Sequence, residues 1–237
     1  MTPLSDRQHD AFDNAAKMAC REGDLRVLRE AAFLLWEDGE RKRLRCDWCE
    51  LMGATGLRTL ELLEREGVLA AGGFVGVDLD AGRIAEFRRL RPDLKWLAAN
   101  LYERLDAPEL ANVGVLNLDE YGEIGDPDAR GDFHLIRAVV RRGLDKFGEF
   151  ALFWNQDLDA VVRRRNNRAE ALRRHVDMVC LSLKGCLPRR ELTPEMLLPA
   201  GSEQQIDAGF VGVLGAFEIY RGKRRGHRMA NLRLILR

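Results

Sequence analysis

From Leu44 onward, short apolar segments alternate with stretches of helical period, a pattern that few folds can satisfy. Each apolar segment predicts a strand, and each intervening stretch predicts a helix. A helix between successive strands is a crossover connection, so we expect parallel strands in a sheet covered by helices. The predicted strands are 44–52, 73–77, 95–99, 113–118 and 149–154, and the predicted helices are 57–66, 81–90, 133–146 and 157–179.

The last part of the chain breaks this alternation. Two strand-like runs, 210–220 and 227–236, are joined by a short connection that permits only an antiparallel hairpin. We therefore predict an α/β fold, Rossmann-like, with a mostly parallel seven-stranded sheet, helices on both faces and a C-terminal antiparallel hairpin. Residues 1–43, where two amphipathic helices are expected, are predicted to form an N-terminal helical cap on a domain spanning 44–237.

Composition limits the class of protein. The 237 residues are 46% hydrophobic and 32% charged, values typical of a globular chain rather than a disordered one. No apolar run approaches the roughly 20 residues that a membrane helix needs, and no basic-then-apolar leader opens the sequence. Five cysteines, an odd number, favour reduced thiols. We expect a cytoplasmic protein without membrane association.

Neither the cysteines nor the histidines have the spacing of a metal site. Cys46 and Cys49 are three residues apart, but they lie in a predicted strand, where such positions face opposite sides of a sheet. Buried thiols are therefore favoured over a metal-binding or redox pair. We expect no metal site.

A glycine-bearing turn follows the first predicted strand. Gly53 and Gly56 allow the backbone to approach a ligand, and the following helix begins with free N–H groups and a partial positive charge. Asp78 ends the second predicted strand, 22 residues after Gly56, where an acidic side chain commonly binds ribose hydroxyls. The combination is typical of a site for a nucleoside-containing cofactor.

Two cofactor classes share this layout. The segment Gly53-Ala54-Thr55-Gly56 matches the opening of the glycine motif of NAD(P)-dependent short-chain reductases, although Thr59 stands at the third glycine position. That class also needs a Tyr-x-x-x-Lys pair, which neither Tyr121 nor Tyr220 provides.

By contrast, Glu50, six residues before Gly56, resembles the acid of the acid-x-x-x-G-x-G motif of class I S-adenosylmethionine-dependent methyltransferases. In that family the acid lies near the methionine end of the cofactor. The middle glycine of the motif is Ala54 here, and Gly53 stands one place earlier. The resemblance implies that S-adenosylmethionine is the cofactor. It assigns the cofactor site to Glu50, Gly53, Thr55, Gly56, Asp78, Asn100 and Leu101.

Later segments resemble the same family, so that the resemblance spans about 43–237. The segment Asp119-Glu120-Tyr121-Gly122 after the fourth predicted strand is similar to the Asp-Pro-Tyr-Gly motif of dimethylguanosine-forming tRNA methyltransferases, with Glu120 in place of proline. This implies that Asp119 and Tyr121 form the acceptor pocket: an oxygen of Asp119 would hold the N–H groups of a base, and Tyr121 would stack on its ring. The family's fold usually ends with an antiparallel strand beside the fifth, as the predicted hairpin would provide.

The net charge of zero is a cancellation. Residues 160–237 carry a balance of +9 and residues 1–159 a balance of −9. Such a molecule can steer an anionic acceptor to one side. The expected substrate contacts are Arg163, Arg164, Arg165, Lys223 and Arg224.

We therefore predict a methyltransferase with a nucleic-acid acceptor, RNA before DNA. Two alternatives stay open. One is a protein of the same fold that has lost activity and serves as a binding subunit, which the altered glycine turn and Glu120 would explain. The other is a short-chain reductase.

Overall fold

The computed structural model describes residues 15–52, 56–101, 104, 106–120, 133–157, 168–187, 192–197, 206–210, 213–221 and 228–237. The strands are β1 (Asp47–Leu51), β2 (Phe74–Asp78), β3 (Lys95–Ala98), β4 (Val113–Glu120), β5 (Phe150–Asp157), β6 (Ile206–Phe210), β7 (Val213–Arg221) and β8 (Arg228–Leu236). The helices are α2 (Ala15–Ala31), α3 (Gly56–Arg65), α4 (Ala81–Leu90), α6 (Phe133–Phe147), α8 (Arg168–Ser182) and α9 (Pro194–Leu197), with a 3₁₀ turn, η4 (Pro108–Leu110).

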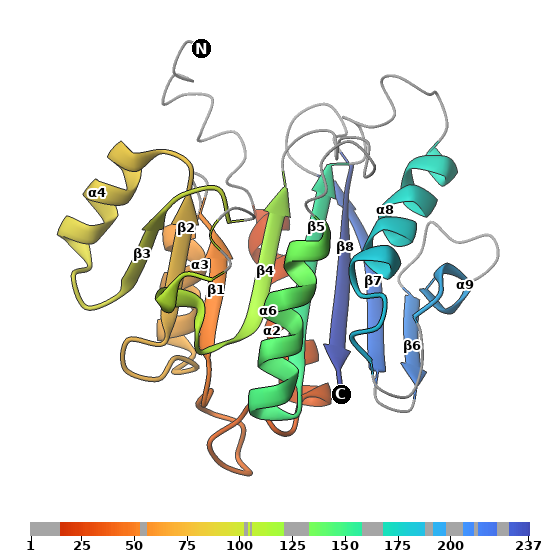
Figure 1. The fold of residues 1–237 in the computed structure, drawn as a ribbon, viewed down its shortest axis with the longest axis horizontal. Coiled ribbons are helices and arrows are strands. Elements are labelled where there is room, and N and C mark those ends of the chain that lie inside the picture. The colour runs from red at the N-terminus through yellow and green to blue at the C-terminus, as the bar shows by residue number, and fades with distance from the viewer. Residues whose placement is uncertain are drawn as a thin grey trace.

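All the described strands belong to one sheet, in the order β3-β2-β1-β4-β5-β8-β7-β6 (Figure 1). The five strands from β3 to β5 pair in parallel, whereas β8, β7 and β6 each join the sheet through an antiparallel pairing. This confirms the predicted α/β fold with a mostly parallel sheet and a C-terminal antiparallel pair. The last strand, β8, lies between β5 and β7, so it inserts beside the fifth strand.

The described sheet has eight strands rather than the seven predicted. The additional strand is β6, the short segment Ile-Asp-Ala-Gly-Phe that pairs with β7 at the edge. Asp and Gly are poor strand formers, so the sequence gives little strand signal there. An edge strand needs a partner on one side only, and the backbone of β7 supplies it.

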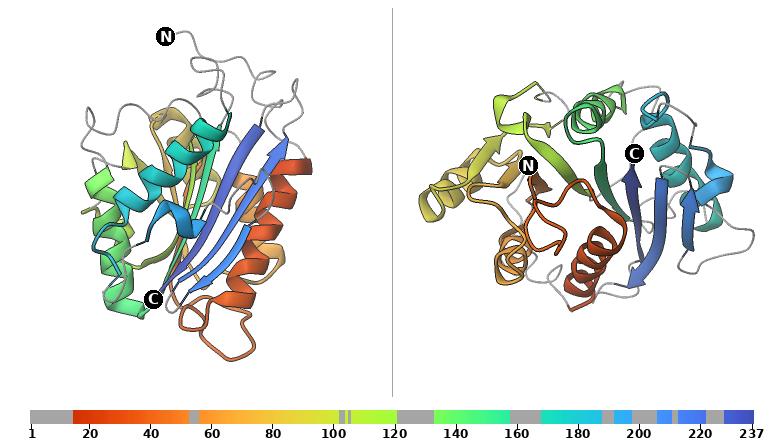
Figure 2. Two further views of the ribbon diagram at one scale, coloured as in Figure 1. Left: turned by 90° about the vertical axis from the view of Figure 1, so that its right-hand side faces the viewer. Right: turned by 90° about the horizontal axis from the view of Figure 1, so that it is seen from below.

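Two groups of buried side chains pack against the sheet. Helix α2 contributes Leu28 to a cluster that contains Phe153 of β5 and Ile235 of β8. The neighbouring residues of those strands, Trp154 and Leu234, belong instead to a cluster with side chains of α6 and α8. Successive strand residues point to opposite faces, and Figure 2 shows α2 on one side of the sheet and α8 on the other. Within the predicted cap 1–43, the described part therefore holds a helix that packs directly on the sheet.

Glu149, which precedes β5, fixes the chain where α2 ends. Its Oε2 accepts hydrogen bonds from the backbone N–H groups of Phe33 (2.8 Å), Leu34 (2.7 Å) and Leu35 (3.2 Å). Its Oε1 accepts another from Nε of Arg237, at 2.7 Å. Glu149 is fully buried. This carboxylate joins the segment after α2 to the amino end of β5 and to the C-terminus.

The five cysteines are buried and free, as predicted. Cys46 and Cys49 belong to different clusters and so lie on opposite faces of the sheet. Burial raises the pKa of the Cys46 thiol to about 12, which disfavours the reactive thiolate. Within the described residues, no helix combines the length and apolar character needed to cross a membrane.

Candidate functional site

The carboxyl ends of four neighbouring parallel strands carry residues that the sequence assigned to a site. Glu50 lies one residue before the end of β1, Asp78 ends β2, Asn100 follows β3 by two residues, and Asp119 lies one residue before the end of β4. These strands are adjacent in the order β3-β2-β1-β4. From β1 the chain continues to β2 and then β3 on one side of β1. It then returns to form β4 on the other side of β1. The strand order therefore reverses between β1 and β4, the place where open α/β sheets bind ligands.

Other predicted site residues lie around this edge or outside the described part. Gly56 is the first residue of α3, and Leu101, buried, directly follows Asn100. Asp119 lies opposite Asn155 of β5 in the strand register. The positions outside the described residues are Gly53, Thr55, Tyr121, Arg163, Arg164, Arg165, Lys223 and Arg224.

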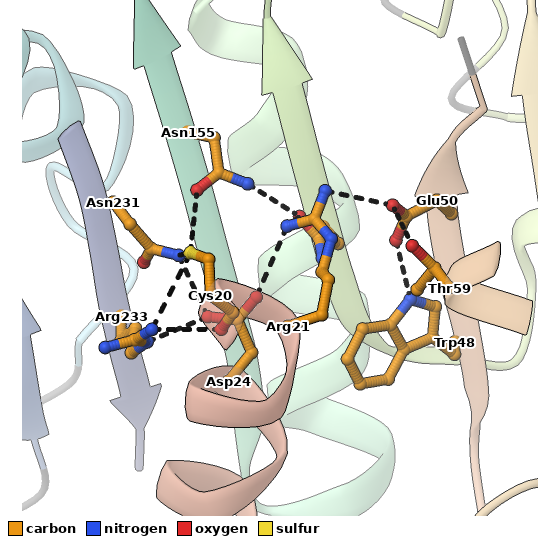
Figure 3. A network of polar contacts seen from close by, with 10 residues as sticks. Cys20, Arg21, Asp24, Trp48, Glu50, Thr59, Asn155, Asn231 and Arg233 are labelled. Carbon is orange, nitrogen blue, oxygen red and sulfur yellow. Dashed lines mark hydrogen bonds and ion pairs between the residues drawn. The ribbon is translucent and has the colours of Figure 1, made fainter. Parts of the chain in front are cut away.

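Glu50 is 1% exposed, and both of its oxygens are engaged (Figure 3). Oε1 accepts hydrogen bonds from Nη2 of Arg21 at 3.1 Å and from the hydroxyl of Thr59 at 3.3 Å. Oε2 accepts one from the indole N–H of Trp48 at 2.9 Å. The carboxylate thus ties β1 to the first turns of α3 and to α2, and it is sealed from solvent.

Arg21 of α2 makes the pair with Glu50 part of a larger charge network. Its Nη1 donates to Oδ1 of Asn117 on β4 at 3.0 Å and to Oδ2 of Asp24 at 3.3 Å. Asp24 also pairs with Nε of Arg233 on β8, at 2.8 Å. The four charged residues, two cations and two anions, are each at most 2% exposed. Buried charges are tolerated when they are paired and hydrogen-bonded, and this set balances to zero.

Sequence reasoning missed this network, although two signals were present. Asn231 and Arg233 alternate with leucines in β8, so two polar side chains share one face of an otherwise apolar strand. Gly23 lies inside α2, where glycine costs about 1 kcal/mol relative to alanine. A Cβ at Gly23 would collide with the guanidinium of Arg233. The glycine lets the helix come close enough for Asp24 to reach that arginine.

The end of β2 is more open. Asp78 Oδ1 accepts from the backbone N–H of Asp80 at 2.8 Å, and Oδ2 accepts from Nη1 of Arg83 at 2.6 Å. Between the two acids, Leu79 is 76% exposed. Asp80 is the N-cap of α4, and its Oδ1 accepts from the N–H groups of Gly82 and Arg83. The hydrogen bond from the Arg83 N–H contributes most to lowering the pKa of Asp80.

This edge places an acidic side chain next to an exposed apolar side chain. A carboxylate at the end of β2 offers acceptors for hydroxyl groups, and the exposed Leu79 offers an apolar surface beside it. Over the described ranges, no group of three or more His, Cys, Asp or Glu side chains is arranged to hold a metal. Leu79 was not among the predicted site residues, because an exposed side chain cannot be recognised from sequence.

Neither the known protein-family models nor the curated proteins that were searched include a match to this chain.

Proposed function

We propose that the chain is an S-adenosylmethionine-dependent methyltransferase that acts on a nucleic acid, RNA before DNA. One observation carries the proposal: Glu50, Asp78, Asn100 and Asp119 lie at the carboxyl ends of four adjacent strands around the reversal of strand order. The antiparallel β8 beside β5 supports it further.

The residues at the nucleoside end fit the cofactor. Asp78 would accept hydrogen bonds from the ribose hydroxyls, and Leu79 would pack on one face of the adenine. Asn100 and Leu101, after β3, would border the adenine edge. The N–H groups at the start of α3, near Gly56, face the same end of the sheet and favour a negatively charged group such as a carboxylate.

At the methionine end of the cofactor, we propose no direct contact with Glu50. The carboxylate is sealed by Arg21, Thr59 and Trp48, so in this proposal Glu50 shapes the turn after β1 and does not touch the ligand. Gly53 and Thr55 would form that turn.

When bound, S-adenosylmethionine supplies a methyl group activated by a positively charged sulfur. The chain then needs mainly to align the acceptor and exclude water. Asp119 would hold the N–H groups of an exocyclic amine so that the nitrogen lone pair faces the methyl carbon, and Tyr121 would stack on the base. Asp119 would also be placed to accept the proton that the acceptor amine loses when it is methylated.

Isothermal titration calorimetry with S-adenosylmethionine, S-adenosylhomocysteine and NADP tests the cofactor. We expect the first two to bind and NADP not to bind. Absence of binding by the first two would refute the proposal, and binding of NADP alone would favour the reductase.

An Asp119→Ala variant tests the acceptor pocket. We expect it to bind S-adenosylmethionine but to lose methyl transfer to an RNA pool, measured with a radiolabelled methyl group. Asp145→Ala, which changes an exposed acid of α6, is the control. Methylation by Asp119→Ala at the wild-type rate would exclude this role.

Charge reversal tests the nucleic-acid acceptor. Changing Arg163, Arg164 and Arg165 to Glu should weaken RNA binding and flatten its salt dependence, because fewer counterions are released. The matched control reverses Arg26, Arg89 and Arg104, exposed arginines of the acidic part of the chain. Equal RNA binding by the two triple variants would contradict the assignment.

A second candidate is a binding subunit of the same fold without activity. The sealed carboxylate of Glu50 and the presence of Glu120 instead of proline favour it. Binding of S-adenosylmethionine without turnover on any substrate pool would support this candidate over the enzyme.

A further inference from the structure

We infer that Arg21 is a positioning residue for the proposed cofactor site, holding the carboxyl ends of β1 and β4 at a fixed separation from its place on α2. The inference rests on the proposed function, in which β1 borders the cofactor and β4 carries the acceptor residues. No catalytic contact is assigned to Arg21.

Arg21 spans the point where the strand order reverses. Its Nη2 reaches Glu50 on β1 at 3.1 Å (Figure 3). Its Nη1 reaches Asn117 on β4 at 3.0 Å. These two residues are direct partners in the parallel register of β1 and β4. Both contacts lie just below the edge that carries the candidate site, on the face covered by α2.

The chemistry of the guanidinium suits this task. Its planar fork presents donors in fixed directions, so one side chain can bond two strands and its own helix at once. Asp24 receives the third contact, at 3.3 Å. A lysine would keep the charge but lacks the fork, and it could not maintain all three contacts.

Glu50 depends on Arg21 as well. Arg21 gives its carboxylate a positively charged donor, whereas the indole of Trp48 and the hydroxyl of Thr59 are neutral donors. A carboxylate that is 1% exposed needs a positive partner. Loss of Arg21 would therefore favour a shift of Glu50 and of the turn that follows it.

Arg233 provides an internal control. It is also buried and also pairs with Asp24, it donates to the backbone of Cys20 on α2, and it lies on β8, two strands from β4. Arg21→Lys and Arg233→Lys thus disturb the same carboxylate of Asp24. Arg21→Lys in addition changes the contacts with Glu50 on β1 and Asn117 on β4.

The experiment compares these two variants in the full chain by calorimetry with S-adenosylmethionine and S-adenosylhomocysteine, alongside thermal unfolding. We expect Arg21→Lys to weaken both affinities by roughly 10- to 100-fold, the loss typical of removing a residue that orients a binding group. Arg233→Lys should lower the unfolding temperature comparably and leave the affinities unchanged. Equal affinity losses in the two variants, or none in Arg21→Lys, would overturn the inference.

Amide hydrogen exchange gives a readout that does not depend on the cofactor. We expect Arg21→Lys to speed exchange at Met52, whose N–H bonds to Val77, and at 116–118, whereas Arg233→Lys should speed it in β8. If the wild type binds neither ligand, the proposed function fails, and the exchange pattern still decides the role of Arg21. Exchange unchanged at both strand ends would refute that role.

Should Arg21→Lys fail to fold, a milder pair gives the same comparison. Asn117→Ala removes the bridge to β4, and Asn231→Ala removes the hydrogen bond to Asp24 on the β8 side, 2.9 Å long. A loss of cofactor affinity confined to Asn117→Ala supports the inference, and equal losses overturn it.

Discussion

Two buried carboxylates at opposite edges of the parallel sheet, Glu149 and Glu50, contact α2 or the segment that follows it, but they differ in what they bind. Glu149, at the amino end of β5, accepts three backbone N–H groups from Phe33, Leu34 and Leu35. Glu50, at the carboxyl end of β1, accepts hydrogen bonds from the side chains of Arg21, Trp48 and Thr59.

The difference separates a structural anchor from a functional support. Backbone N–H groups are present whatever the side chains, so the Glu149 anchor needs only the correct chain path. The Glu50 contacts need an arginine, an indole and a hydroxyl from three different elements, all converging where the strand order reverses. We therefore expect changes at Glu149, at the amino ends of the parallel strands, to affect stability. Changes at the carboxyl ends of these strands should affect ligand binding.

The largest expected effect is that of Glu149→Ala on stability. Three backbone N–H groups, including that of the buried Leu35, would lose the buried carboxylate that accepts from them, which should lower the free energy of unfolding by about 3 kcal/mol. Urea unfolding measures this loss. Affinity for S-adenosylmethionine in the folded protein should stay the same.

Glu66→Ala is the matched control for Glu149→Ala. Glu66 pairs with Arg29 of α2, but both side chains are about one third exposed (34% and 38%). Such a pair contributes about 0–1 kcal/mol. If both variants lost equal stability, or if Glu149→Ala weakened cofactor binding, the distinction between the Glu149 and Glu50 edges of the sheet would fail.

The next largest effect concerns Asp78, where we expect the change in cofactor affinity rather than in stability. Asp78→Asn should weaken S-adenosylmethionine binding by about 1.5–3 kcal/mol, the contribution of a hydrogen bond to a charged group. Calorimetry measures the change. Arg83→Met removes the same 2.6 Å ion pair while leaving the carboxylate, so it should preserve affinity. Equal weakening in both variants would assign Asp78 a structural role only.

A smaller effect is expected at Leu79. Replacing it by alanine removes apolar surface from one face of the proposed adenine site, a loss of about 1–2 kcal/mol in binding. Stability should change by less than about 0.5 kcal/mol, because the side chain is 76% exposed. Leu90→Ala, at a residue 48% exposed at the end of α4, is the control. Unchanged affinity in Leu79→Ala would remove Leu79 from the site.

The repeating strand-helix pattern made the fold predictable. Every strand of the parallel part and the β7–β8 hairpin were expected within a few residues of their observed bounds. Period-2 and period-3.6 patterns are local, and they identify such elements without tertiary information. The edge strand β6 was missed because Asp207 and Gly209 weaken that local signal.

The site was predictable only in part. Positions such as Asp78 and Asn100 could be predicted because they lie at or just after strand ends, which the hydrophobic pattern of the sequence locates. Partners such as Arg21 with Glu50, or Asp24 with Arg233, are 29 and 209 residues apart in sequence. Their pairing depends on how α2 crosses the sheet, which no local pattern specifies. The same tertiary arrangement seals Glu50, whose motif alone suggested an accessible acid.

The smallest effect is the pH dependence contributed by Asp80. Hydrogen bonds from the N–H groups of Arg83 and Gly82 lower its pKa in the folded protein. A lowered folded-state pKa means that the stabilisation is present above the unfolded-state pKa of about 4 and is lost as pH falls through the folded-state value. Asp80→Asn and Asp80→Ser both retain an N-cap acceptor but cannot titrate.

Unfolding in urea at a series of pH values tests this contribution. Wild type should be more stable than either Asp80 variant at neutral pH, and the difference should shrink below about pH 4. Because Asp80 is exposed and caps α4 beside the open end of β2, the effect should remain small and should not alter the Glu149 anchor. A stability difference independent of pH would show that the cap acts through hydrogen-bond geometry alone and not through the charge at this edge of the sheet.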